Sequence, residues 1–444
     1  MSDHKIINAR IVTPDRIIRG YLVYSHNGKI LSVGEGKGPE TEEVLDAQGA
    51  WLVPGGIDPH VHLGGFGEIP IADDFYHGSL GALAGGTTTV IDFCEPEAGE
   101  SSLHCIAKRK KEAEQSAVDY AFHFVLTEAY KKQLEDLEDI LKEGIRNFKL
   151  FTIYPNTTLK KEDFREIWQY FSGKKQDFTF LVHAEAAEEI EKRKEQVKDR
   201  KDVFQLAQTR PGRSETDTVK WLREIQRQYG EKVCIAHVSA GKTVELAEKD
   251  SAFTMETCPH YLMFTEEKLK GPLGALYTMT PPLRKKSDVE ELWKGIFDGR
   301  ISMLSTDHCP YHRRNKLGKS FDEIPCGVDG IQLRMLFLYS EGVVKRGLSM
   351  EEYVRLTAEN AARFYGLYPE KGCLAPGSDA DLVLINEEET TEITNGYCKS
   401  SLDYSIYDGM RFQGKISMVL KGGKIVYNGE NVMASRGSGC YLGV

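Results

Sequence analysis

The sequence predicts an α/β fold: a (β/α)8 TIM-type barrel with a small β-sandwich domain built from both termini. The middle of the chain, residues 54–371, alternates short apolar runs with longer amphipathic segments, as repeated βα units around a parallel sheet do. The two ends instead contain short β-rich runs and hairpin signals. An open doubly wound sheet is the alternative for the middle segment, but the chain contains neither a GxGxxG motif nor a P-loop.

The barrel elements are predicted from the apolar pattern of the middle segment. The predicted strands are short apolar runs with many β-branched and aromatic residues, at 88–92, 120–125, 148–151, 178–183, 233–237 and 301–305. The predicted helices are the longer amphipathic segments at 105–117, 132–143, 160–172, 214–228 and 350–364.

The terminal segments have similar textures. Asn27-Gly28 and Gly422-Gly423 are tight-turn signals, each close to short β-rich runs. Two unrelated terminal hairpins would explain this pattern. The alternative, which we adopt, is one domain formed by residues 1–53 and 372–444, with a catalytic barrel of residues 54–371 inserted between them.

Composition narrows the class of protein. The chain has 444 residues, 41% of them hydrophobic and 28% charged, which is ordinary for a globular protein. Its net charge of −10 is spread along the chain and argues against binding to nucleic acid or to an anionic membrane. The nine cysteines form no CxxC pair, and no signal peptide or membrane-length apolar run is present. We therefore expect a cytoplasmic protein with reduced thiols.

A first candidate for chemistry is the pair His60 and His62. In extended backbone, residues two apart project from the same face, so both imidazoles can reach one metal ion. On its own, an HxH spacing also fits two polar residues in a loop.

Three more ligand-type residues follow predicted strands. His183 and His237 end two of the runs, and Asp307 follows a third. The C-terminal ends of barrel strands converge on one face, where active sites are built. We expect these side chains to meet His60 and His62 there.

Lys149 lies inside the apolar run Asn147–Phe151. A lysine in such a strand is costly unless it is paired, chemically altered, or able to extend its ammonium to water. A protonated ammonium has no lone pair for a metal. A lysine carboxylated by carbon dioxide would instead offer an anion able to bridge two cations.

Together, these motifs resemble the dihydropyrimidinase and hydantoinase family of cyclic amidohydrolases. The matching segments occur in the family's order and cover almost the whole chain: Pro54–His62, Asp73–Phe75, Gly85–Thr89, Phe148–Phe151 with Tyr154, Val182–Glu185, Ala236–Ser239, Glu256–His260, Pro281–Arg284, Thr306–Pro310 and Leu374–Asp381.

The resemblance implies a centre of two divalent ions, zinc by default, bridged by carboxylated Lys149. One ion would be held by His60, His62, Lys149 and Asp307, and the other by Lys149, His183 and His237. A hydroxide generated at this centre would open a hydantoin or dihydropyrimidine ring to an N-carbamoyl amino acid. Asp307 would carry the proton, and Tyr154 would donate a hydrogen bond to the developing oxyanion.

The resemblance also implies where the small-molecule ring would bind. Relatives hold it through main-chain groups near positions 280 and 333, here Thr280 and Leu333, where serine and asparagine or aspartate are common. Leu63 and Phe66 belong to a loop that shapes the pocket for the ring substituent. These departures leave the preferred ring and substituent open. We expect a homotetramer or homodimer.

Two other functions remain as alternatives. Allantoinase or another ring hydrolase would use the same centre, although dihydroorotase needs a cation for its substrate carboxylate and no arginine follows His62 directly. A role as a non-catalytic scaffold relative fits this sequence less well, because such relatives have lost metal ligands and all six ligand positions are intact here. We expect His260 and His308 to support the site rather than to bind metal.

Overall fold

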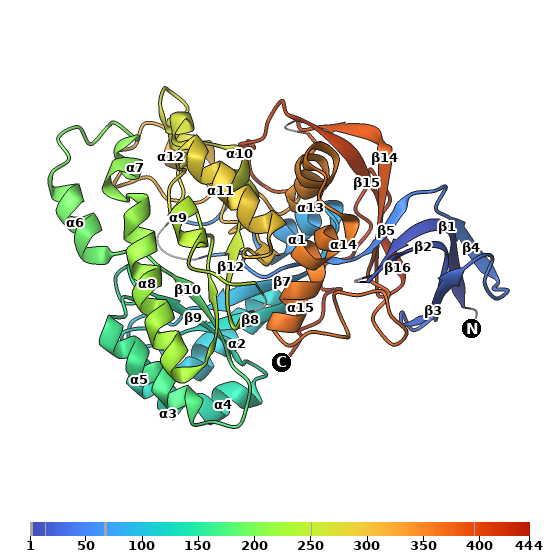
Figure 1. Cartoon of the computed structure of the whole chain (residues 1–444), viewed down its shortest axis with the longest axis horizontal. Coiled ribbons are helices and arrows are strands. Elements are labelled where there is room, and N and C mark those ends of the chain that lie inside the picture. The colour runs from blue at the N-terminus through green and yellow to red at the C-terminus, as the bar shows by residue number, and fades with distance from the viewer. Residues whose placement is uncertain (1–2, 14, 66–68, 250, 395) are drawn as a thin grey trace.

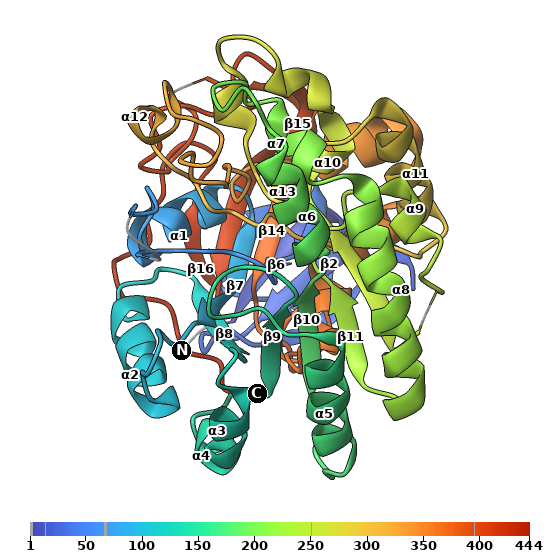
Figure 2. The same ribbon diagram turned by 90° about the vertical axis from the view of Figure 1, so that its left-hand side faces the viewer.

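The protein is described by a computed structural model that covers residues 3–13, 15–65, 69–249, 251–394 and 396–444. Eight parallel strands form its centre, in the order β13-β12-β11-β10-β9-β8-β7-β6. Their bounds are β6 (Gly56–Asp58), β7 (Thr87–Cys94), β8 (Asp119–Val125), β9 (Asn147–Phe151), β10 (Thr179–His183), β11 (Lys232–Ile235), β12 (Phe253–Thr257) and β13 (Met303–Leu304). Beyond the two edge strands, Val61 pairs in parallel with His308, which closes the sheet into a barrel. Figure 2 shows β7, β8, β9, β10 and β11 of this sheet side by side.

Helices surround this barrel (Figure 1). Their bounds are α1 (Phe75–Ala84), α2 (Ser102–Ala113), α3 (Tyr130–Glu135), α4 (Leu137–Lys142), α5 (Lys161–Ser172), α6 (Ala187–Glu195), α7 (Gln205–Thr209), α8 (Gly212–Tyr229), α9 (Gly241–Val244), α10 (Pro259–Met263), α11 (Lys286–Phe297), α12 (Arg313–Lys316), α13 (Arg334–Phe337), α14 (Met350–Val354) and α15 (Asn360–Phe364). Short 3-10 and π-helical segments complete the helical layer. The 3-10 segments are Glu266–Leu269 and Gly274–Tyr277, and the π-helical segments are Leu338–Val344 and Arg355–Glu359.

Apolar spacing explains why these helices pack as they do. In α5, Phe164, Ile167, Trp168 and Phe171 recur at intervals of three and four residues, and all are buried. This stripe faces the barrel, because only one side of an amphipathic helix can leave water. Burying each such large side chain contributes roughly 1.5–3 kcal/mol.

The six predicted strands and most of the predicted helices are confirmed, with small shifts at their ends. The segment 132–143 is an exception, because two helices, α3 and α4, meet there at Asp136. Helix α2 begins earlier than predicted, since the Ser101 side chain accepts a hydrogen bond from the backbone N–H of His104 and caps it. The strands β6 and β12 and the helix α11 were not predicted.

Both ends of the chain enter one mixed sheet, in the order β16-β15-β14-β5-β1-β2-β3, with β4 pairing β1. Its strands are β1 (His4–Val12), β2 (Ile17–Tyr24), β3 (Ile30–Glu35), β4 (Glu43–Asp46), β5 (Trp51–Pro54), β14 (Leu382–Glu392), β15 (Arg411–Lys421) and β16 (Lys424–Tyr427). The decisive pairing is β5 with β14, where Val53 lies opposite Val383. One domain built from both termini is therefore confirmed, although its exact boundaries at 53/54 and 371/372 remain predictions.

The C-terminal segment returns to the barrel. Tyr441 pairs with Tyr120 at the start of β8, and the Val444 N–H donates to the carbonyl of Gly144. Nearby, Asp119 forms ion pairs with Lys371 at 2.5 Å and Lys421 at 2.7 Å. These contacts lie at the N-terminal end of the strands and leave the opposite face of the barrel to the site. In the part of the chain that the structure covers, no helix is long and apolar enough to cross a membrane.

Candidate active site at the C-terminal face of the barrel

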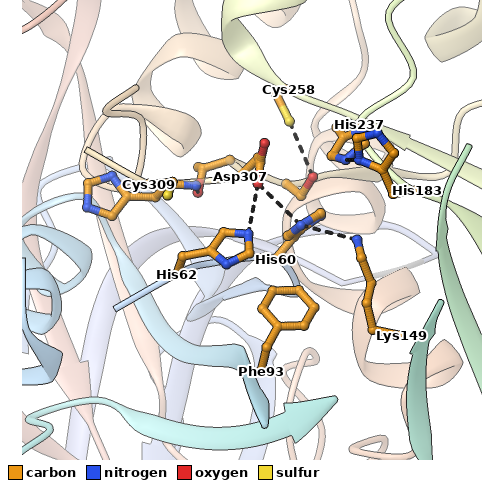
Figure 3. Close-up of polar contacts among 12 residues, drawn as sticks. His60, His62, Phe93, Lys149, His183, His237, Cys258, Asp307 and Cys309 are labelled. Atoms are coloured by element: carbon orange, nitrogen blue, oxygen red, sulfur yellow. Dashed lines mark hydrogen bonds and ion pairs between the residues drawn. The ribbon is translucent and has the colours of Figure 1, made fainter. Parts of the chain in front are cut away.

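The six residues predicted as metal ligands all lie along or just beyond the C-terminal ends of barrel strands. His60 and His62 follow β6, Lys149 lies within β9, His183 ends β10, and His237 and Asp307 lie two and three residues beyond β11 and β13. Figure 3 shows these side chains pointing toward one another. The structure therefore brings the whole predicted set together.

One half of the site is centred on Asp307. Its Oδ1 lies 3.2 Å from Nε2 of His60 and 3.1 Å from Nε2 of His62. The ligand atoms of these three residues lie within 4.8 Å of one another, close enough to bind one metal ion.

The other half contains His183, His237 and Lys149. Nδ1 of His183 and Nε2 of His237 lie 3.0 Å apart. Nζ of Lys149 lies 3.5 Å from Nε2 of His60, and the lysine is fully buried. The amine of Lys149 therefore lies beside the ring of His60, a member of the first half.

Two buried glutamates orient the histidines. Oε1 of Glu256 lies 2.5 Å from Nδ1 of His60, which leaves Nε2 of that ring directed at Asp307. Oε2 of Glu185 lies 2.9 Å from Nε2 of His183, which leaves Nδ1 directed at His237. A carboxylate on one ring nitrogen sets the tautomer and makes the other nitrogen the better ligand.

Burial controls the charges at the site. It lowers the pKa of His60, His183 and His237, which keeps these imidazoles neutral. Burial also lowers the pKa of Lys149 to about 8, against the attraction of Glu256 and Asp307. Burial would raise the pKa of Glu185, but Arg210 and His183 outweigh it and hold that pKa at about 2.

These residues fit a divalent metal centre. Neutral imidazole is the ligand form of histidine, and histidine with carboxylate is a donor set that zinc accepts. Within the described residues, the buried Nδ1 of His237 has no hydrogen-bond partner, and its Nε2 faces another ring nitrogen. When the nitrogens of two neutral imidazoles face each other, a cation that binds both of them satisfies their lone pairs.

Three of the functional candidates have left-handed backbone conformations. The φ angles are 85° at Tyr154, 38° at His237 and 49° at Asp307. Non-glycine residues rarely adopt such angles, which cost of order 1–3 kcal/mol each and cluster at active sites. The turns after the strands therefore direct these side chains into the barrel mouth at a cost in stability.

Tyr154 lies beside the histidines, with its ring 5.1 Å from that of His183. Its hydroxyl donates a hydrogen bond to Oγ1 of Thr280 at 2.7 Å. Burial raises the pKa of Tyr154, so the phenol keeps its proton and remains a donor. The predicted pair Tyr154 and Thr280 is thus brought together next to the candidate metal ligands.

The other predicted substrate contacts are placed differently. Leu333 is buried at the start of α13, and its N–H donates to the carbonyl of Gly330. Leu63 is fully buried, with its side chain against Gly78 of α1, and belongs to the hydrophobic core. Phe66 lies outside the described residues. Substrate binding by these three residues remains a prediction.

Comparison with known proteins agrees with this geometry. The chain matches the amidohydrolase family over residues 51–426. It is 33% identical to a D-hydantoinase of Geobacillus stearothermophilus, over 98% of this chain and 95% of that protein. It is 31% identical to a D-hydantoinase of Ralstonia pickettii, over 98% of each. A crystal structure of dihydropyrimidinase from Brevibacillus agri superposes with a TM-score of 0.94 at 31% identity, covering 99% of this chain and 98% of that one. The chain belongs to the amidohydrolase family.

This amidohydrolase is a metal-dependent hydrolase that acts on cyclic amides, as the resemblance implied. The fold and the ligand-type side chains agree with that membership.

Several residues that support this amidohydrolase site were not predicted from the sequence. Glu256 lies in β12, which has the sequence Phe-Thr-Met-Glu-Thr. The polar residues of this strand interrupt the apolar pattern from which the other strands were predicted. Glu185 follows His183 by two residues and forms an ion pair with Arg210. Asp58 accepts hydrogen bonds from the N–H and hydroxyl of Thr306, directly before Asp307. The buried glutamate in the Glu256–His260 motif was the one signal that could have pointed to Glu256.

His308 forms hydrogen bonds outside the set of candidate ligands, and its supporting role remains a prediction. Its Nε2 lies 2.9 Å from Oδ2 of Asp73, and its Nδ1 accepts from the N–H of Gly330. His260 is fully buried near Asp307, and both ring nitrogens lack hydrogen-bond partners in the described part of the chain.

We expect Glu256→Gln to lower metal affinity and activity roughly 10–100-fold, the usual cost of losing an outer carboxylate partner. The neutral amide would bind Nδ1 of His60 less strongly and would no longer enforce one tautomer. Metal dissociation constants from chelator competition measure the effect directly. Glu248→Gln, which removes a partly exposed carboxylate on the surface, serves as the control. Equal metal affinity in Glu256→Gln and the native protein would contradict the assigned role.

Proposed function

We propose that this amidohydrolase opens hydantoin or dihydropyrimidine rings to N-carbamoyl amino acids, using two divalent ions bridged by carboxylated Lys149. The observation that carries the proposal is the convergence of four histidines, Lys149 and Asp307 at one barrel mouth, with Tyr154 beside them. The relatives named D-hydantoinase and dihydropyrimidinase support the choice of ring.

The ligands divide into two groups that share Lys149. His60, His62 and Asp307 would hold one ion with Lys149, while His183 and His237 would hold the other with Lys149. No carboxylate within the described residues lies at ion-pair distance from Nζ of Lys149, although the side chain is fully buried. Burial lowers the pKa of Lys149 to about 8 and so favours its neutral amine, which carboxylation by carbon dioxide would turn into the anion that two neighbouring cations require. We take zinc as the default metal.

The bound ions would lower the pKa of water and polarise the ring carbonyl. Asp307 would accept the proton of the attacking water as its oxygen bonds to the carbonyl carbon. It would then deliver that proton to the ring nitrogen as the carbon–nitrogen bond breaks. Tyr154, protonated and within reach of Thr280, would donate a hydrogen bond to the oxygen that gains negative charge.

Substrate profiling tests the proposed ring. We expect kcat/KM for 5-substituted hydantoins and dihydrouracil to exceed that for dihydroorotate and allantoin by more than tenfold, about 1.4 kcal/mol of transition-state stabilisation. The reason is that a substrate carboxylate finds no arginine directly after His62, and burying it without a cation costs several kcal/mol. All four rings must be compared at one pH and one metal content. A lead for dihydroorotate or allantoin would overturn the substrate assignment but not the metal-dependent mechanism.

We also propose a cytoplasmic homotetramer or homodimer. All nine cysteines are free thiols, and five of them are buried, which suits a reducing compartment. Light scattering during size-exclusion chromatography gives the assembly directly.

A further inference from the structure

Glu95 is an acidic residue at the barrel mouth that the mechanism above does not use. It directly follows β7, whose residues alternate between the interior of the barrel and its helical layer. Ile91 and Phe93 belong to the apolar cluster inside the barrel, so alternation directs the next residue of that set, Glu95, into the mouth. The residue is half-buried.

The ring of Phe93, two residues before Glu95, indicates how close Glu95 is to the candidate metal ligands. This ring stacks on that of His62 at 4.6 Å and lies 5.1 Å from that of His60. Glu95 is thus one step further along the same inward-facing row, beyond the C-terminal end of β7. Burial raises the pKa of Glu95, while His62, Lys149 and Arg109 oppose the rise, which agrees with this placement.

The carboxylate of Glu95 has no hydrogen bond or ion pair among the residues that the structure covers. The nearest guanidinium, that of Arg109, is committed elsewhere: it binds Asp92, Glu112 and the carbonyls of Phe93 and Leu63. Lys149 would itself become an anion on carboxylation. A half-buried carboxylate without a protein cation is costly, and a ligand that carries a positive charge relieves that cost.

We propose that Glu95 determines specificity for the ring substituent and selects cyclic amides whose substituent carries an ammonium or guanidinium group. This inference rests on the proposed ring hydrolysis and names its substrate class. A cationic substituent gains a charge-assisted hydrogen bond to the carboxylate, an apolar one leaves the carboxylate desolvated, and an anionic one is repelled.

Three hydantoins of similar length test the proposal: those with 5-(4-aminobutyl), 5-pentyl and 5-(3-carboxypropyl) substituents. We expect kcat/KM to fall in that order, by at least tenfold from the cation to the neutral chain. In Glu95→Gln the preference for the cation should disappear, and the carboxylate substrate should gain activity. Titration calorimetry with the products Nα-carbamoyl-lysine and N-carbamoyl-2-aminoheptanoate should show the same loss of preference for the cation in binding.

Glu97→Gln is the matched control. Glu97 lies in the same loop, but its side chain is 79% exposed and pairs with Lys108 on the surface. This variant should keep the native order of substrates. Metal content is measured in parallel, because a loss of metal in Glu95→Gln would make Glu95 a metal ligand and overturn the proposal. Equal kcat/KM for the cationic and neutral hydantoins would also overturn it, while failure to hydrolyse any hydantoin would instead contradict the proposed function.

Discussion

Lys149→Ala is expected to lose both bound metal and turnover, with kcat/KM falling roughly 10³-fold or more, since the charge stabilisation that the ions provide would vanish. The side chain is fully buried, and its Nζ lies 3.5 Å from Nε2 of His60. Metal analysis should find about two ions per native chain and under one in the variant.

Two further variants separate the bridge from a general loss of packing. Lys149→Arg should not restore activity, because a guanidinium cannot be carboxylated in this way. Short carboxylic acids added to Lys149→Ala should partly restore activity by occupying the space of the missing anion. Lys316 is another fully buried lysine, bound to the carbonyls of Thr278 and Gly327, and Lys316→Ala should destabilise the fold yet retain both ions. Near-native metal content and activity in Lys149→Ala would rule out the bridging role.

Asp307→Asn is expected to lower kcat by about 10²–10⁴-fold, the usual contribution of a positioned proton acceptor. The amide keeps an oxygen near His60 and His62 but cannot take up a proton from water. The native Oδ1 lies 3.1–3.2 Å from Nε2 of both rings. Part of the loss will come from weaker metal binding, so kcat is measured at saturating metal with the metal content of each sample.

Asp322→Asn provides a comparison for this substitution. Asp322 pairs with Arg200 on the surface at 2.7 Å, where an ion pair contributes about 0–1 kcal/mol to stability. The control should therefore keep native kcat. If Asp307→Asn retained more than a tenth of native kcat with both ions bound, another group would have to carry the proton.

Local sequence patterns were sufficient for most of the barrel and for the candidate ligands. A strand such as β10 is a run of apolar residues with a histidine at its end, and both features are visible without any partner. Because parallel strands place their C-terminal ends on one face, residues at those ends meet whatever the details of packing. This is why His183, His237 and Asp307 were predicted from widely separated parts of the chain.

Tertiary structure decided what local patterns do not record. β12 was not predicted because Thr254 and Glu256 interrupt its apolar residues. The side chains that contact these two polar residues come from other elements, which only the closed barrel brings near. The packing of the Leu63 side chain against Gly78 of α1 is likewise a contact that the local pattern does not specify.

The sequence by itself determined the α/β barrel and the six ligand-type residues, because each depends on local periodicity or on position at a strand end. That the two termini share one domain was decided by the pairing of β5 with β14. Only the tertiary structure decided that Glu256 binds His60, 196 residues away in the chain, and that Glu95 has no partner in the part described. The physical reason is that periodicity specifies which face of an element is buried. It does not specify which side chain from another element will contact that face. The charges and tautomers of an active site depend on those contacts.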